Sequence, residues 1–76
     1  MRLDHLRYFI EAARCGSISA AARNVRLAQP AFSAHIRMLE QELGLTLLER
    51  STKGVTLTEA GARLYEGALS LFRHVD

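Results

Sequence analysis

The sequence has a single cysteine and no long hydrophobic run. Cys15 has no second cysteine with which to form an internal disulfide. Apolar stretches such as 43–48 are far shorter than the roughly 20 residues that span a bilayer. The N-terminus brings in Asp4 and Glu11 early and lacks the apolar segment and cleavage site of a signal peptide. We therefore expect a cytoplasmic protein with no membrane partner.

Residues that build metal or catalytic sites are also scarce. The candidate metal ligands are His5, His35, His74 and Cys15, and their separations match no zinc motif. The sequence has no Gly-rich phosphate loop and no Gly-x-Ser-x-Gly turn around a nucleophile. We expect no metal, no cofactor and no enzyme activity, and we interpret the histidines as surface or helix-end residues.

The composition fits one small globular domain. At 76 residues the chain can form one hydrophobic core, and its 49% hydrophobic content excludes intrinsic disorder. The net charge of +2 permits an anionic partner without requiring one. The middle of the chain mixes basic and acidic residues: Arg23, Arg26, Arg37, Arg50 and Lys53 with Glu40, Glu42 and Glu49 as expected partners. Charge alone therefore favours an ordinary solvated surface.

Two amphipathic helices are predicted in the first third of the chain. Apolar residues recur at i, i+3, i+4 and i+7 in two segments: Leu6, Phe9, Ile10 and Ala13, then Ile18, Ala21, Ala22 and Val25. Gly16 is a typical helix terminator, and Ser17 and Ser19 are candidate N-caps for the second helix. The alanine run in this second helix should allow another helix to approach closely.

A third helix is predicted to begin near Gln29, because Pro30 is favoured in a first helical turn. Its apolar stripe consists of Phe32, Ile36, Leu39 and Leu43. Gly44 then supplies the stop. Two helices joined by a short turn form a helix-turn-helix, in which the second helix reads DNA.

A hairpin and a last helix are predicted after Gly44. The β-prone segments 45–48 and 55–57 flank the polar segment 49–54, which indicates a small wing. Thr58 is a candidate cap for the final helix, which carries two apolar stripes: Leu64, Ala68, Leu71 and Val75, then Tyr65, Leu69 and Phe72. One small core cannot easily cover both stripes. We therefore infer that part of this face meets a second copy of the chain.

The candidate DNA-binding residues lie on the third helix and in the hairpin. A helical wheel places Pro30, Ser33, Ala34, Arg37 and Gln41 opposite the apolar stripe. Gln29 and Ser33 lie near the helix N-terminus, where Gln can pair with adenine and Ser can contact any base. Arg50, Thr52 and Lys53 are expected at the wing, against phosphates or in the minor groove. Each residue alone is also compatible with a solvated surface, whereas the set together with a wing favours DNA.

Residues 2–61 resemble the N-terminal DNA-binding domain of LysR-type transcriptional regulators. The resemblance includes the opening Leu3-x-x-Leu6-x-x-Phe9, the segment 16–22 (GSISAAA) and the segment 29–33 (QPAFS). Further matches are Ile36, Leu39-Glu40, Leu43-Gly44, Leu47, Arg50, Leu57-Thr58 and Ala60-Gly61. The expected fold is mainly α, a winged helix-turn-helix with a three-helix core, a small β-hairpin wing and the start of a long C-terminal linker helix.

The resemblance also implies domain boundaries and partners. Residues 1–58 would form the DNA-binding domain, with the helix-turn-helix at about 18–37 and the wing at about 45–57, while 59–76 would begin the linker helix. Family members are usually dimers or tetramers that bind interrupted palindromes in double-stranded DNA. Their small-molecule inducers act through an effector domain that is absent from this chain. Dimerisation through the linker helix would use Leu64, Tyr65, Ala68, Leu69 and Phe72.

Four positions depart from the common family pattern. Ala28 replaces a Ser or Thr that could cap the helix, Ala34 replaces a frequent Arg, and His35 replaces a commoner Gln. Leu48 replaces a frequent Phe, which changes packing only. We predict a relaxed or altered base preference where Ala34 faces the DNA.

Two other interpretations remain open for a small winged domain. It could be a protein–protein interaction module, whose third helix and wing contact another protein instead of DNA. It could also belong to a related winged-helix family, such as the molybdate-responsive regulators. A small enzyme is a distant third possibility.

Overall fold

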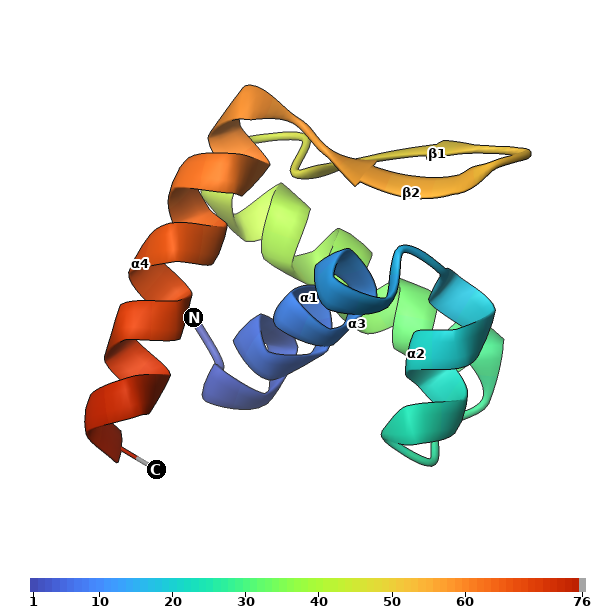
Figure 1. Ribbon diagram of the computed structural model, residues 1–76, viewed down its shortest axis with the longest axis horizontal. Helices are drawn as coiled ribbons and strands as arrows, with labels where there is room; N and C mark the ends of the chain where they lie inside the picture. The colour runs from blue at the N-terminus through green and yellow to red at the C-terminus, as the bar shows by residue number, and fades with distance from the viewer. Residues whose placement is uncertain (76) are drawn as a thin grey trace.

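The computed structural model describes residues 1–75, with the side chains of His74 and Val75 left out, so that these two side chains and Asp76 lie outside the described residues. The elements are α1 (Leu3–Cys15), α2 (Ile18–Asn24), α3 (Gln29–Leu43), β1 (Leu48–Ser51), β2 (Gly54–Leu57) and α4 (Glu59–Val75). In Figure 1 the first three helices form one body, the hairpin extends along one side of it, and α4 descends along one end. The expected winged helix-turn-helix fold, mainly α, is confirmed.

The core lies where α1, α2 and α3 meet. Its largest fully buried side chains are Phe9, Phe32, Ile36, Leu39 and Leu47. Burying an aliphatic or aromatic side chain of this size contributes roughly 1.5–3 kcal/mol, so these residues carry much of the folding free energy. Ala21 and Ala22 are also buried, and their small side chains let α2 approach both neighbouring helices.

Both predicted helix stops among the first three helices are confirmed. Gly16 and Gly44 adopt left-handed backbone angles after α1 and α3, with φ of 67° and 69°. Ser17 caps α2, because its side chain accepts a hydrogen bond from the Ala20 N–H at 3.1 Å. Ala28 provides no side-chain cap for α3, as expected from its methyl group.

The turn between α2 and α3 is closed by two backbone hydrogen bonds. The N–H of Arg26 donates to the Arg23 carbonyl at 3.1 Å, and the N–H of Leu27 donates to the Ala22 carbonyl at 2.9 Å. This pattern is a Schellman motif, which requires a left-handed residue after the helix. Arg26 occupies that position with φ of 61°, in a conformation that costs a non-glycine residue roughly 1–2 kcal/mol.

The wing differs from its predicted boundaries. We expected strands at 45–48 and 55–57, but β1 begins at Leu48 and continues to Ser51. The pairing runs from Leu48 opposite Leu57 to Ser51 opposite Gly54, so the loop is only Thr52 and Lys53. The earlier segment is not a strand because its backbone binds other partners: the Glu40 carboxylate accepts from the Leu47 N–H, and the Thr46 carbonyl accepts from the Thr58 hydroxyl.

The final helix begins at the predicted cap. The Thr58 hydroxyl accepts a hydrogen bond from the Gly61 N–H at 2.9 Å, while it donates to the Thr46 carbonyl. In the described part of the chain, no helix is both long enough and apolar enough to cross a bilayer.

The packing of α4 differs from the expectation for its two apolar stripes. Ala68 and Phe72 are buried within this chain, and Tyr65 packs edge-on against Phe9 with ring centroids 6.5 Å apart. The guanidinium of Arg7 covers the Phe72 ring at 4.2 Å. The core therefore covers more of α4 than the sequence suggested, and Leu64 and Leu69 are half-buried. Leu71, at 43% exposure, is the large apolar side chain of α4 that remains open among those described.

Candidate nucleic-acid interface

The outer face of α3 carries most of the predicted recognition residues. Gln29, Pro30 and Arg37 are exposed, and Ala34 is half-buried. They project from a helix whose opposite side is fixed by Phe32, Ile36 and Leu39 in the core. The face can therefore meet a partner without moving the helix.

We expected Ser33 on this outer face, but its side chain is buried. It is only 7% exposed. At about 100° per residue it sits some 60° from Ile36, on the shoulder of the buried stripe. Nη1 of Arg50, which extends from β1, donates to the Ser33 hydroxyl at 3.3 Å and helps to cover it. Ser33 is thus joined to the wing through an arginine.

The wing tip is exposed. Arg50, Ser51, Thr52 and Lys53 all have open side chains. The turn is ordered by a hydrogen bond from the Lys53 N–H to the Ser51 hydroxyl at 3.2 Å. Two cations and two hydroxyls therefore project from one end of a short hairpin, a combination suited to phosphate oxygens.

A polar cleft of about 250 Å³ separates the wing from the helix-turn-helix. The first turns of α2 and α3 form one wall, and the wing forms the other. The residues that line it are Ser17, Ile18, Ser19, Gln29, Arg50, Ser51, Thr52, Gly54 and Val55. The cleft thus brings Gln29 of α3 close to Arg50 and Thr52 of the wing, which lie far from it in the sequence.

Ser19 also lines this cleft, although the sequence indicated it only as a candidate helix cap. Its hydroxyl donates to Oε1 of Gln29 at 2.9 Å, and so joins α2 to α3 across the turn. The sequence offered one signal: of the two candidate capping serines only one can cap α2, which leaves the other hydroxyl for another partner.

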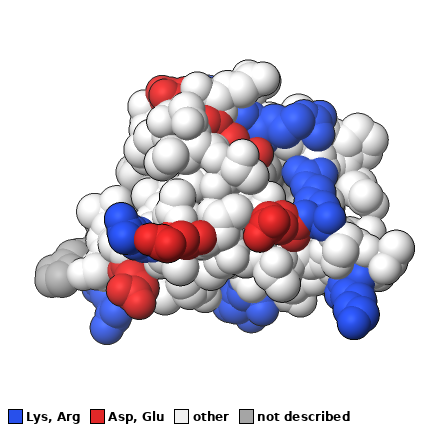
Figure 2. Space-filling model, turned by 90° about the horizontal axis from the view of Figure 1, so that it is seen from above, with Lys and Arg blue, Asp and Glu red and all other residues white. Residues whose placement is uncertain are grey.

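The expected pairing of basic with acidic residues in the middle of the chain is not what forms. Within the described residues, no ion pair involves Arg23, Arg26, Arg37, Arg50 or Lys53. Glu40 binds backbone N–H groups instead, and Glu42 pairs with the N-terminus. Figure 2 views the molecule from the wing side: basic side chains gather toward the side of the wing tip, and the visible acidic side chains lie away from it. These cations are available to an anionic partner.

His5 and His35 are not the exposed residues that we expected, and the side chain of His74 lies outside the described residues. His5 is 7% exposed, and its Nε2 lies 3.0 Å from Nδ1 of half-buried His35. Tyr8 lies beside His35 with ring centroids 5.3 Å apart and the ring planes tilted by 40°. The pair joins α1 to α3 behind the outer face. No group of three potential metal ligands occurs in the described residues.

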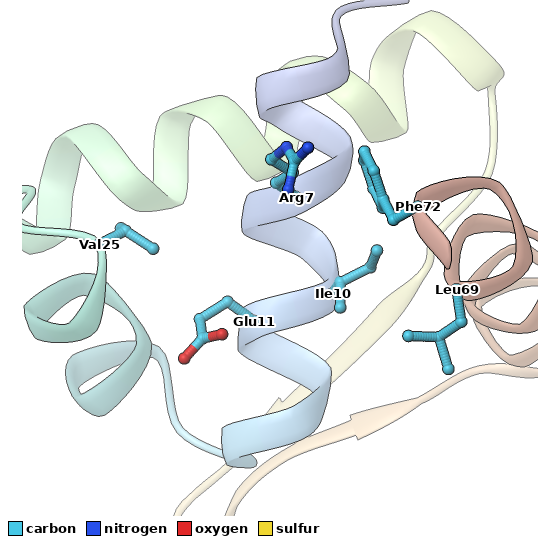
Figure 3. A pocket seen from close by; sticks show the side chains of 6 residues that line it. All are labelled: Arg7, Ile10, Glu11, Val25, Leu69 and Phe72. Atoms are coloured by element: carbon cyan, nitrogen blue, oxygen red, sulfur yellow. The ribbon is translucent and has the colours of Figure 1, made fainter. Parts of the chain in front are cut away.

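A second hollow, of about 320 Å³, lies along α1. Figure 3 shows Arg7, Ile10 and Glu11 projecting from α1, with Leu69 and Phe72 of α4 on one side and Val25 on the other. The Asn24 amide donates to Glu11 at 2.8 Å, and this bond, assisted by Arg14, lowers the pKa of the Glu11 carboxyl. Burial raises the pKa of the neighbouring Cys15 thiol. These contacts fasten α2 to α1.

Known proteins match this chain over nearly its whole length. The profile described as bacterial regulatory helix-turn-helix protein, lysR family, matches residues 3–62. The HTH-type transcriptional regulator TfdS of Cupriavidus pinatubonensis (strain JMP 134 / LMG 1197) is 48% identical over 68 residues, which are 90% of this chain and 23% of that protein. The chain spans about a quarter of the length of several such curated relatives.

Solved structures agree closely with the fold. The crystal structure of the BenM DBD/catB site 1 DNA complex superposes with a TM-score of 0.96 at 42% identity, covering 100% of this chain and 84% of that one. The CbnR DBD–DNA complex superposes with a TM-score of 0.92 at 37% identity, covering 99% of this chain and 86% of that one. The chain therefore belongs to the LysR family of bacterial regulatory helix-turn-helix proteins.

Proposed function

We propose that this chain binds double-stranded DNA as the DNA-binding part of a LysR-type transcriptional regulator. The supporting observation is that the outer face of α3 and the wing tip flank one polar cleft and carry cations that pair with no acid among the described residues. The solved relatives BenM and CbnR were crystallised as DNA complexes of the corresponding domain. The function is binding and regulation, without catalysis, in the bacterial cytoplasm.

In this proposal α3 enters the major groove and the wing meets the backbone or the minor groove. Gln29, Pro30, Ala34 and Arg37 face the base edges or the adjacent phosphates. Arg50, Thr52 and Lys53 contact the backbone from the wing. Ser33 acts through Arg50, because the arginine covers its hydroxyl. Ala34 offers no hydrogen bond to a base, so discrimination at the base pair that it faces is weak.

The proposed assembly is a homodimer that reads an interrupted palindrome, with tetramers in the longer regulator. Two-fold symmetric proteins bind two half-sites, which makes a palindrome the natural target. Contact through α4 would use Leu64, Tyr65 and Leu69, which are half-buried in one chain, together with the open Leu71. A small-molecule inducer would act through a separate domain.

The direct test is a fluorescence-anisotropy titration of random-sequence duplex DNA at two salt concentrations. Affinity should fall steeply with salt, because bound cations release counterions from the phosphates. The double variant Arg37→Ala/Lys53→Ala should weaken binding about 10-fold or more and reduce the salt slope by about 2. Analytical ultracentrifugation of the same samples reports whether the chain is dimeric.

The control is Arg63→Ala/Arg73→Ala, which removes the same charge from α4, where both arginines are exposed. It should leave the salt slope nearly unchanged. If the control weakened binding as much as the test variant, net charge rather than the proposed face would account for it. An absence of binding at low salt would support a protein–protein interaction module instead.

A further inference from the structure

Gln29 is the longest polar side chain at the start of the proposed recognition helix, and it is exposed. A free glutamine has several rotamers, and fixing one of them on binding costs conformational entropy. A side chain held in advance loses less entropy on binding. The contacts of Gln29 in the free chain therefore bear on how well it can read a base.

The contact that holds Gln29 comes from α2. The Ser19 hydroxyl donates to Oε1 of Gln29 at 2.9 Å. Ser19 is free for this because the neighbouring Ser17 caps the helix. Both residues line the cleft that opens toward the wing, so the amide is held at the edge of the proposed interface.

The position of Ser19 relative to α3 is itself fixed. Ala21 and Ala22 of α2 are buried in the same core as Phe32 of α3. The turn between the helices is closed by the Leu27 to Ala22 backbone bond. The Ser19 hydroxyl is therefore a rigid point from which to orient the Gln29 amide.

The orientation has a chemical consequence. A glutamine Oε1 has two lone pairs, and Nε2 has two donors. With one lone pair of Oε1 engaged by Ser19, the amide still offers one acceptor and its donors in a fixed order. Adenine presents a donor at N6 beside an acceptor at N7, which matches that order, whereas guanine presents two acceptors at O6 and N7.

We propose that Ser19 is a positioning residue that sets the base preference of Gln29 in favour of adenine. This inference rests on the proposed DNA-binding function. Ser19 acts through the amide, so its loss should lower affinity most for duplexes that carry the preferred base pair, and discrimination at that base pair should fall. A serine that simply contacted a phosphate would instead lower affinity for every sequence equally.

The test begins with selection of bound sequences from a pool of random duplex DNA by the 76-residue chain. The base preference at each position is then measured for the wild type, Ser19→Ala, Ser19→Thr and Gln29→Ala. Ser19→Ala should reduce the preference about threefold to tenfold at the base pair where Gln29→Ala abolishes it. Ser19→Thr keeps the hydroxyl and should restore the preference. The double variant Ser19→Ala/Gln29→Ala should lose no more than Gln29→Ala alone.

A second measurement examines the free chain. The side-chain amide of Gln29 should show restricted motion by nitrogen-15 NMR relaxation in the wild type and Ser19→Thr, and greater motion in Ser19→Ala. Equal motion in all three chains would overturn the role of Ser19, and so would a loss of affinity in Ser19→Ala that is uniform over all sequences. Neither result would affect the proposed DNA-binding function. An ordered amide in a wild-type chain that binds no duplex would overturn the proposed function, and this inference with it.

Discussion

The wing is held very differently at its two ends. At the base, Leu47, Leu48 and Val55 are buried in the core. The Val55 N–H donates to the Gly16 carbonyl, and the Thr58 N–H donates to the Leu47 carbonyl, both at 3.0 Å. At the tip, residues 50–53 are exposed. Beside the strand pairing of Arg50 and Ser51, the side-chain hydrogen bonds there are one within the turn and one from Arg50 to Ser33.

Within one hairpin, this difference separates residues that stabilise the fold from residues that bind. Changes at the base remove buried contacts or buried hydrogen bonds and should lower the free energy of unfolding. Changes at the tip remove exposed groups and should alter DNA affinity while the fold persists. The following variants test that separation, beginning with the largest effect.

Gly61→Ala should break the base of the wing. A Cβ added at Gly61 would lie 2.0 Å from the Leu47 carbonyl oxygen, so the backbone at the junction of the wing and α4 must move. We expect a loss of roughly 3 kcal/mol in unfolding free energy, measured by urea denaturation. Gly67→Ala is the matched control in the same helix, because a Cβ there meets nothing within 4 Å. It should stabilise the chain by about 0.5–1 kcal/mol, and equal stability of the two variants would refute the close contact.

Glu40→Ala should loosen the base without a clash. The carboxylate accepts hydrogen bonds from the Leu47 and Leu48 N–H groups at 2.8 and 3.3 Å. Its removal leaves these donors unpaired, at a cost of about 2 kcal/mol, while Glu40→Gln keeps one acceptor and should lose about half as much. Glu42→Ala removes an acid on the same helix whose partner is the N-terminus and should change stability little. Faster hydrogen exchange at Leu47 and Leu48 should accompany the loss, and its absence would contradict the anchoring role.

Arg50→Ala should show the opposite pattern at the tip. DNA affinity should fall about 10-fold and the salt slope by about 1, because one phosphate contact is lost. Unfolding free energy should change by less than about 0.5 kcal/mol, as expected at an exposed position. Arg50→Lys should keep the salt slope. A large loss of stability in Arg50→Ala would mean that the tip is also structural.

Glu11→Gln should have the smallest effect, and it concerns neither end of the wing. The pKa of Glu11 is lowered by the Asn24 hydrogen bond, so its stabilising effect is present above its ordinary value of 4.5 and is lost as the pH falls through the lowered value. At pH 7 the unfolding free energy of Glu11→Gln should be lower than that of the wild type by about 1 kcal/mol or less. This difference should shrink in acid, and urea unfolding over a pH series measures it. Glu66→Gln, on the exposed side of α4, is the control. A deficit that is independent of pH would contradict the assignment.

Local signals in the sequence predicted the helices well. Gly16 and Gly44 end α1 and α3, and Ser17 and Thr58 cap α2 and α4, because each of these effects acts within one turn of a helix. The strand boundary was missed because the backbone near Leu47 bonds to Glu40, seven residues earlier, and no pattern within the segment encodes that contact.

The candidate site was harder to predict because some of its residues lie at the border between the buried and the exposed face of a helix, where packing determines exposure. His5 precedes Phe9 by four residues and His35 precedes Leu39 by four, so each lies only about 40° from a core residue on its helix. Ser33 lies in a similar position and is covered by Arg50 from the wing. A helical wheel cannot decide such positions, because a neighbouring element determines whether they meet solvent.

The left-handed Arg26 has a consequence for how this turn would change under selection. Glycine would relieve the backbone strain there, so repeated selection for heat resistance alone should enrich glycine at position 26. Repeated selection for DNA affinity should keep arginine if its exposed guanidinium contacts a phosphate. The residue recovered from each regime would show what the turn is maintained for.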